Sequence, residues 1–142
     1  MIDVPLPTIR HNGPRPFPPR VSRFTRPFWT ALEQGFLTAP KCQACGRLRF
    51  PPRPLCPACW SEDHVWIVLR PHGRLYSFTR IHVAPRALDG DLPYAIGIID
   101  LDDGVRLLCR LVNQVTFADI GREVETVVLQ YDDGPLFAAR LI

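Results

Sequence analysis

The stretch CQACGRLRFPPRPLCPAC, residues 42–59, decides the fold, because it holds four of the five cysteines of the 142-residue chain. The cysteines form two C-x-x-C pairs, Cys42 with Cys45 and Cys56 with Cys59, and ten residues separate the pairs. Two such pairs are typical of a zinc ribbon, in which each pair forms a tight knuckle and all four thiolates bind one metal ion. Because four cysteines complete the tetrahedron, we expect a structural zinc ion with no position open for catalysis.

Some questions about this segment stay open at the level of sequence. A four-thiolate site also accepts iron, and the spacing alone does not separate the two metals. Disulfides are disfavoured, because the N-terminal stretch MIDVPLPTIRHNG lacks the basic start and apolar core of a secretory signal. We therefore expect a cytoplasmic protein, and no apolar run reaches the roughly 20 residues that a membrane helix needs. Gly46 follows the first cysteine pair but Trp60 follows the second, so we expect the second knuckle to turn differently.

Prolines and helix signals organise the residues that precede the cysteines. The density of proline in residues 1–23 predicts an extended arm, either solvated or laid against another surface. Residues 24–39 are expected to form a short helix with Thr25 as its N-cap. Large apolar side chains recur there at helical spacing and suit either the core or an anchor that faces a partner. We assign to partner contact Phe24, Phe28, Trp29 and Leu32.

After the predicted zinc ribbon of residues 40–70, apolar residues alternate with polar ones, which is typical of strands. The expected strands are 73–83, 94–101, 105–112, 122–131 and 135–142. Asp-Gly pairs at 103–104 and 133–134 lie between apolar runs and predict two tight hairpins. On the first strand, Leu75 and Ser77 are expected on one face and Tyr76 and Phe78 on the other.

This strand pattern predicts a mainly β chain that ends in a five-stranded OB-fold barrel over residues 71–142. The strand count alone fits another small barrel or an open meander equally well. Cys109 lies among leucines of the third expected strand, so we expect an ordinary core residue there.

The charge of the chain is unevenly distributed. The net charge is +3, but residues 1–53 hold nine basic and two acidic residues, whereas residues 54–142 hold eight basic and twelve acidic ones. OB barrels and zinc ribbons both occur in proteins that bind single-stranded nucleic acid, which we keep as an alternative function. An acidic barrel disfavours it, because a groove for nucleic acid needs positive charge.

The order of these motifs resembles the Zn-ribbon/OB-fold family of acyl-CoA-associated proteins over roughly residues 24–142. The distinctive parts are PFWTALEQGFL (27–37), the cysteine segment with FPPR (50–53), GRLYSFTRIH (73–82) and PYAIGIIDLDDGVRLL (93–108). The resemblance implies a small non-catalytic subunit that accompanies a thiolase-type enzyme, such as a thiolase or a retro-aldolase of steroid side chains, in a hetero-oligomer. It further implies that this subunit helps to hold the CoA thioester, while the partner performs the chemistry.

The residues themselves offer candidates for such contacts with CoA. Arginine grips phosphate groups in a bidentate fork, and three arginines cluster in the zinc loop beside an aromatic residue. A junction between ribbon and barrel would be the expected place for a site built from both parts. We assign to CoA binding Arg47, Arg49, Phe50 and Arg53 of the zinc loop and Phe78 and Thr79 of the first barrel strand.

Overall fold

The computed structural model describes residues 4–142, so residues 1–3 of the predicted arm lie outside the described residues. Strands dominate, as the alternating sequence pattern predicts. In chain order the elements are β1 (Thr8–Arg10), α1 (Arg26–Glu33), β2 (Thr38–Cys42), β3 (His64–Val68), β4 (His72–Ile81), the 3-10 helix η1 (Arg86–Asp91), β5 (Tyr94–Leu101), β6 (Arg106–Leu111), the 3-10 helix η2 (Phe117–Asp119), β7 (Glu123–Tyr131) and β8 (Gly134–Leu141). Within residues 4–142, no helix has the length and apolar character needed to cross a membrane.

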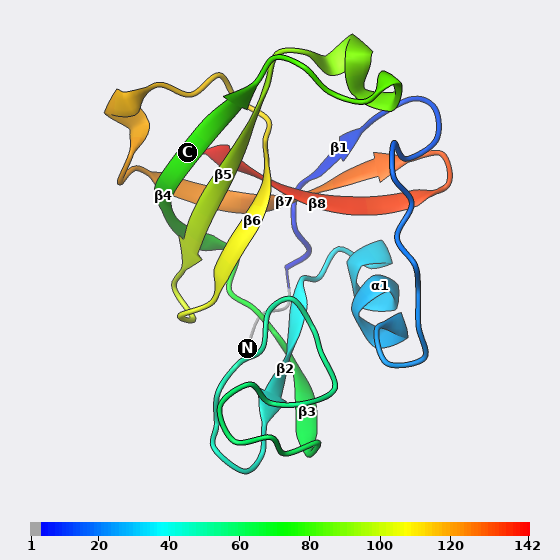
Figure 1. Cartoon of the computed structure of the whole chain (residues 1–142), viewed down its shortest axis with the longest axis vertical. Helices are drawn as coiled ribbons and strands as arrows, with labels where there is room; N and C mark the ends of the chain where they lie inside the picture. Colours follow the sequence, from blue (N-terminus) through cyan, green and yellow to red (C-terminus); the bar gives the residue numbers. More distant parts are fainter. Residues whose placement is uncertain (1–3) are drawn as a thin grey trace.

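Strands β4 to β8 form a closed five-stranded barrel (Figure 1). Their order is β7-β4-β5-β6-β8, and antiparallel pairing of β7 with β8 closes the ring. The break that the sequence predicts between the third and fourth barrel strands contains η2. The mainly β fold with a C-terminal OB-fold barrel is thus confirmed, and the closed ring excludes the open meander.

Local sequence signals explain the two hairpins but not the first barrel strand. Gly104 and Gly134 have φ values of +86° and +146°, the backbone region that the two tight turns need and that glycine adopts without strain. In β4, a β-bulge at Tyr76 interrupts the pairing with β5. The bulge shifts the alternation by one residue, so Phe78 packs against the same core as Leu75, and the predicted division of faces is wrong there.

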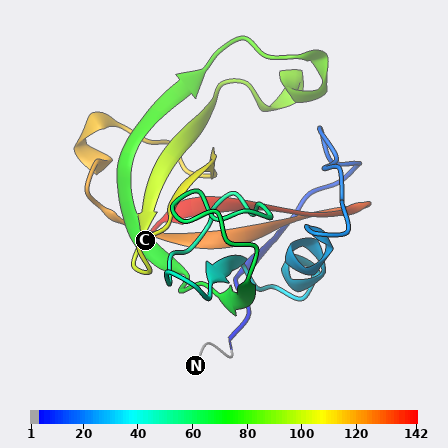
Figure 2. The same cartoon turned by 60° about the horizontal axis from the view of Figure 1, so that its bottom comes forward.

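The zinc ribbon and the helix share one hydrophobic core with the barrel. Strands β2 and β3 pair antiparallel as a small separate sheet at one end of the barrel, and α1 lies beside it (Figure 2). The Leu69 N–H donates to the Leu37 carbonyl at 2.8 Å, and both side chains are buried. They join barrel residues such as Ile99 and Leu107 in the main core. The ribbon is therefore held on the barrel by apolar packing.

One face of the helix packs in this core. Phe28 and Leu32 are only 3% and 0% exposed, so these two residues cannot contact a partner and the prediction is wrong for them. Phe24 and Trp29 are half-buried and keep accessible surface. Thr25 occupies the N-cap position, but its hydroxyl accepts from the Ser22 N–H at 2.9 Å and caps no helix amide.

The proline-rich arm lies against the barrel of its own chain. Strand β1 pairs parallel with residues 128–130 of β7, while β4 pairs with residues 123–125 of the same strand. The arm therefore covers a part of the β7 edge that β4 leaves free, and covering an edge prevents unwanted strand pairing. The family resemblance did not extend to this segment.

Arg15 fixes the arm at the β7–β8 turn. Its backbone N–H donates to Asp133 Oδ1 at 2.7 Å, and its guanidinium donates to the Asp133 and Pro135 carbonyl oxygens at 3.0 and 3.3 Å. The Arg15 backbone N–H also holds the pKa of Asp133 below its usual range. This contribution to arm docking is present above the ordinary carboxyl pKa of about 3.9 and is lost as the pH falls through the lowered value.

An Asp133→Ala substitution tests whether this contact holds the arm. The variant removes the carboxylate acceptor, so we expect trypsin to cut after Arg20 or Arg23 several-fold faster than in the parent chain. Asp102→Ala serves as the matched control, because it removes an exposed acid from the β5–β6 turn, the other hairpin of the barrel. Equal cleavage rates in both variants and the parent chain would contradict the assignment.

Candidate metal centre and neighbouring surfaces

Two equivalent knuckles position the four cysteines of the ribbon. The Gly46 N–H donates to the Cys42 carbonyl and the Trp60 N–H donates to the Cys56 carbonyl, each at 2.9 Å. Gly46 and Trp60 have φ values of +80° and +66°. The expectation that the second knuckle turns differently is therefore wrong. Trp60 adopts the left-handed backbone that glycine adopts in the first knuckle, at a cost of about 1–2 kcal/mol.

The sulfur atoms of the four cysteines fit one zinc ion. All four lie within 4.8 Å of one another, with Cys42 Sγ 3.5 Å from Cys59 Sγ and Cys45 Sγ 3.6 Å from Cys56 Sγ. A tetrahedron with zinc–sulfur distances of about 2.3 Å has edges of about 3.8 Å, close to these separations. All four cysteines are free of disulfides. The predicted ligand set is thus brought together, and it leaves no coordination position for a substrate.

The pKa values of the cysteine thiols indicate that a bound cation is needed to ionise all four of them. The backbone N–H of Cys45 lowers the pKa of Cys42 to about 6, and the backbone N–H of Cys59 lowers the pKa of Cys56 in the same way. Although the Ser61 N–H favours the Cys59 thiolate, the adjacent Cys42 thiol and burial raise the pKa of Cys59 to about 12. Four thiolates this close together repel one another, so a divalent cation is needed to hold all of them ionised.

Arg49 is a buried arginine that hydrogen-bonds several backbone carbonyls of the zinc ribbon. Its guanidinium donates to the carbonyl oxygens of Arg53 and Pro54 at 3.0 and 2.7 Å, and to those of Ser61 and Asp63 at 3.2 and 3.4 Å. The residue is only 1% exposed. Arg49 therefore cannot reach a phosphate of CoA, and the structure contradicts its assignment as a CoA contact. It instead satisfies carbonyls on both sides of the second cysteine pair.

The structure does not bring the other predicted CoA contacts into one site. Arg47 and Arg53 are exposed on the zinc loop, and Phe50 packs against Phe28 and Phe137 with ring centroids 6.0 and 5.8 Å apart. Phe78 instead packs against Phe117 of η2 at 5.7 Å, and its neighbour Thr79 is exposed on β4. The zinc-loop residues and the β4 residues thus belong to different surfaces.

A groove of about 440 Å³ lies where the ribbon meets the barrel. It is lined by Phe50, Pro51, Ile98, Arg106, Leu107, Leu108 and Phe137. We call it the junction groove. Its one charged residue, Arg106, forms a bidentate contact with Asp100 at 2.6 and 2.9 Å. Of these residues, only Phe50 was predicted from sequence to contact a ligand, although the alternation of β6 places Leu108 on the face opposite the buried Leu107.

The fifth cysteine takes no part in the metal centre. Cys109 is buried in the main core, and burial raises the pKa of its thiol to about 12. A thiol of this kind is inert at neutral pH, as expected for a core residue.

Metal analysis tests the metal centre directly. We expect one zinc per chain, and we expect Cys45→Ser to lose it and to unfold the ribbon, because folding of such a segment depends on metal binding. Cys109→Ala is the matched control and should keep one zinc per chain. Zinc retained at full occupancy in Cys45→Ser, or iron in the purified protein, would contradict the assignment.

Replacement of Arg49 separates a structural role from a role in ligand binding. Arg49→Met leaves four carbonyl oxygens without their buried donor, so we expect the free energy of unfolding to fall by about 3 kcal/mol. Arg47→Met removes an exposed arginine two positions away and should change stability by less than about 0.5 kcal/mol. Equal stability of the two variants in urea titrations would show that the hydrogen bonds of the Arg49 guanidinium do not stabilise the ribbon.

Comparisons with known proteins agree with both parts of the fold. Residues 29–65 match the family model of the ChsH2 rubredoxin-like zinc ribbon domain, and residues 66–130 match that of the ChsH2 C-terminal OB-fold domain. A DUF35 domain-containing scaffold protein of Methanocaldococcus jannaschii is 32% identical over 70% of this chain and 72% of its own length. The match confirms the resemblance that the motifs indicate.

Two further relatives are subunits of enzymes. The benzoylsuccinyl-CoA thiolase subunit BbsA of Thauera aromatica is 34% identical over 54% of this chain and 51% of its own length. The alpha subunit of the 3-oxo-4,17-pregnadiene-20-carboxyl-CoA hydratase of Mycobacterium tuberculosis is 31% identical over 84% of this chain. The chain spans 38% of that hydratase subunit and about half of the thiolase subunit.

Among solved structures, a chain of the Ltp2-ChsH2(DUF35) aldolase superposes with a TM-score of 0.76 and 30% identity, over 87% of this chain and 98% of that chain. A DUF35 protein from Sulfolobus solfataricus superposes with a TM-score of 0.60 at 19% identity and supports the fold alone. These comparisons match the same group of proteins to both the zinc ribbon, which holds the four clustered cysteines, and the barrel. The chain belongs to the DUF35 family, with a ChsH2-type zinc ribbon followed by an OB-fold barrel.

Proposed function

We propose that this chain is a non-catalytic subunit that binds a thiolase-type enzyme and helps it to hold a CoA thioester. The observation that carries the proposal is its similarity, over nearly the whole of that chain, to a chain of the Ltp2-ChsH2(DUF35) aldolase. A relative that is a subunit of a CoA-ester thiolase supports the same class of partner. The closed metal centre fits a structural role, because four cysteines leave no coordination position for a substrate.

The junction groove is the surface that we assign to the partner and to the apolar part of the thioester. Its lining is apolar, and Leu108, which is 67% exposed, extends this apolar surface to the solvent; contiguous apolar surface of this kind is typical of contact sites. Because Asp100 already pairs with Arg106, the groove itself offers little to a phosphate. The exposed Arg47 and Arg53 on the zinc loop remain available for the phosphates of CoA.

A second contact with the partner is proposed at the half-buried aromatic residues. Phe24 packs edge-on against His64 at 5.1 Å and beside Trp66 at 5.4 Å, which fixes its orientation. Trp29 is held edge-on against Phe28 at 5.0 Å. Rigid aromatic side chains of this kind are common at the centre of protein interfaces. Of the four partner contacts predicted from sequence, Phe24 and Trp29 are the two that keep this role.

The nucleic-acid alternative receives less support from the same surface. OB folds bind oligonucleotides on the outer face of their second and third strands, which are β5 and β6 here. Apolar Ile98 and Leu108 lie on that face, and the ring of Tyr94 on β5 is covered by the Arg110 guanidinium, so it is not free to stack on a base. The two arginines of this face, Arg106 and Arg110, are paired with Asp100 and Asp91. This face therefore fits an apolar protein surface or acyl chain better than a nucleic acid.

Substitution of Leu108 tests the junction groove. The chain would be co-expressed with thiolase-like subunits from the same organism, and the affinity measured by titration of the purified subunits. We expect Leu108→Arg to weaken the complex at least ten-fold, because an arginine cannot enter an apolar interface without losing its hydration. The side chain is exposed, so folding should be unaffected.

The matched control is Val83→Arg, which places the same charge at an 89% exposed valine between β4 and η1. It should bind like the parent chain. Equal loss of affinity in both variants, or a parent chain that binds no thiolase-like subunit at micromolar concentration, would contradict the proposed function.

A further inference from the structure

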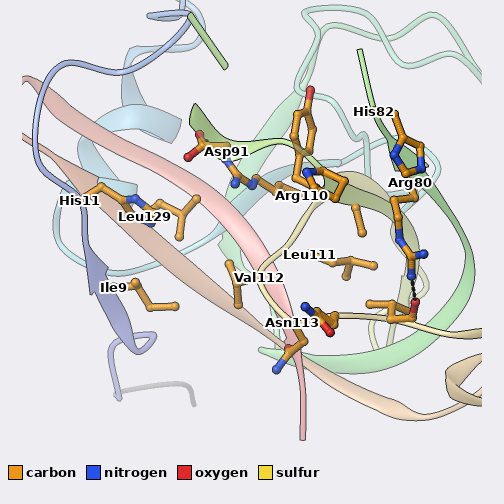
Figure 3. Close-up of a pocket in the computed structure, with 15 residues that line it drawn as sticks. Ile9, His11, Arg80, His82, Asp91, Arg110, Leu111, Val112, Asn113 and Leu129 are labelled. Carbon is orange, nitrogen blue, oxygen red and sulfur yellow. Dashed lines mark hydrogen bonds and ion pairs between the residues drawn. The ribbon is translucent and has the colours of Figure 1, made fainter. Parts of the chain in front are cut away.

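A second cavity, of about 580 Å³, lies at the end of the barrel away from the zinc ribbon (Figure 3). Its floor is apolar and includes Leu111 and Val115 of the main core and Leu129 of a second buried cluster, all 3% exposed or less. We call it the barrel-mouth cavity. Its volume is in the range of cavities that bind small organic molecules.

Cationic and imidazole side chains surround the mouth of this cavity. Arg80 and His82 lie together on one wall, and His11 lies on the opposite wall (Figure 3). Arg110 is also present, but it is held by Asp91 at 3.1 Å and lies over the ring of Tyr94. Asp91 is the one acidic residue of the lining. The balance of charge at the mouth is therefore positive.

Arg80 is the group best placed to receive an anion. One of its nitrogens donates to the Val115 carbonyl at 2.8 Å, which fixes the direction of the guanidinium. Among the residues that the structure describes, no carboxylate forms a salt bridge with Arg80. Its remaining N–H donors lie at a cavity with an apolar floor, where a charge-assisted hydrogen bond is stronger than in open water.

The proline-rich arm completes the cavity. Ile9 of β1 lines it, as does His11, whose ring stacks on Tyr131 with centroids 5.0 Å apart. The His11 N–H donates to the Gln130 carbonyl at 2.8 Å, so the arm is fixed along this wall. These residues precede both family-model matches, which begin at residue 29. The cavity therefore depends on a segment outside the matched ribbon and barrel domains.

We propose that the barrel-mouth cavity binds an organic anion that carries an apolar body. The anionic group contacts Arg80 and the imidazole rings at the mouth, and the apolar body covers Leu111, Val115 and Leu129. This ligand class follows from the lining alone, so the inference goes beyond the proposed function and needs no partner subunit. A free carboxylic acid and a CoA thioester both have this chemistry, and the test separates them.

Calorimetric titration of the zinc-loaded full chain tests the proposal with three probes. Octanoate represents a free acid, octanoyl-CoA represents a thioester, and octanamide is the neutral analogue of octanoate. We expect saturable binding of octanoate or octanoyl-CoA and at least ten-fold weaker binding of octanamide, because only the charged probes have an anion for Arg80. The anion that binds more tightly shows whether the natural ligand is a free carboxylic acid or a CoA thioester.

Two arginine variants locate the site. Arg80→Gln should weaken the bound anion at least ten-fold. Arg74→Gln is the matched control, since Arg74 also lies on β4, is exposed and donates to a backbone carbonyl, that of Gly121 at 3.0 Å. It should bind like the parent chain. His11→Ala should also weaken binding, because it removes part of the wall that the arm supplies.

Three results would overturn the inference. They are the absence of saturable binding of either anion at millimolar concentration, binding of octanamide as tight as that of octanoate, and an Arg80→Gln variant that binds the anion as tightly as Arg74→Gln does. Loss of binding in Leu108→Arg, with no change in Arg80→Gln, would place the ligand in the junction groove. That result would overturn this inference while supporting the proposed function.

Discussion

The four thiolates that hold one zinc ion are the constraint on which the ribbon depends. Two paired strands of five residues are marginally stable in water without further support. The metal ties the two knuckles together, and Arg49 ties the intervening loop from inside through carbonyls on both sides of the second cysteine pair. A zinc ion with four thiolates carries net negative charge, and the buried guanidinium offsets part of it within the same loop.

This local constraint reaches the junction groove because ribbon and barrel share a core. Phe50 follows Arg49 directly and packs against Phe137 of β8 at 5.8 Å and Phe28 of α1 at 6.0 Å. The junction groove is therefore built from the zinc loop on one side and from the barrel on the other. Loss of the metal would remove one wall of the groove, so a structural ion shapes a groove whose lining includes none of its ligands.

Features that depend on a few neighbouring residues were predictable from the sequence, whereas features that depend on packing between distant segments were not. The cysteine pairs and the Asp-Gly turns act within a few residues, and the metal ligands and both hairpins are where they were expected. The fate of Phe28, Leu32 and Arg49 depended on packing between distant segments, which periodicity does not report. Trp60 has the unfavourable backbone that the second knuckle requires, so residue preference was a poor guide there. The docking of the arm through Arg15 joins residues 118 positions apart, and composition held no sign of it.

We propose that this chain works as part of a hetero-oligomer with a thiolase-type enzyme. Native mass spectrometry of the chain, co-expressed with a thiolase-like subunit and purified without affinity selection for either, tests this most directly. We expect one assembly that contains both subunits and one zinc ion for each copy of this chain. Detection of this chain only at the mass of its own monomer or homo-oligomer, beside a free enzyme, would contradict it.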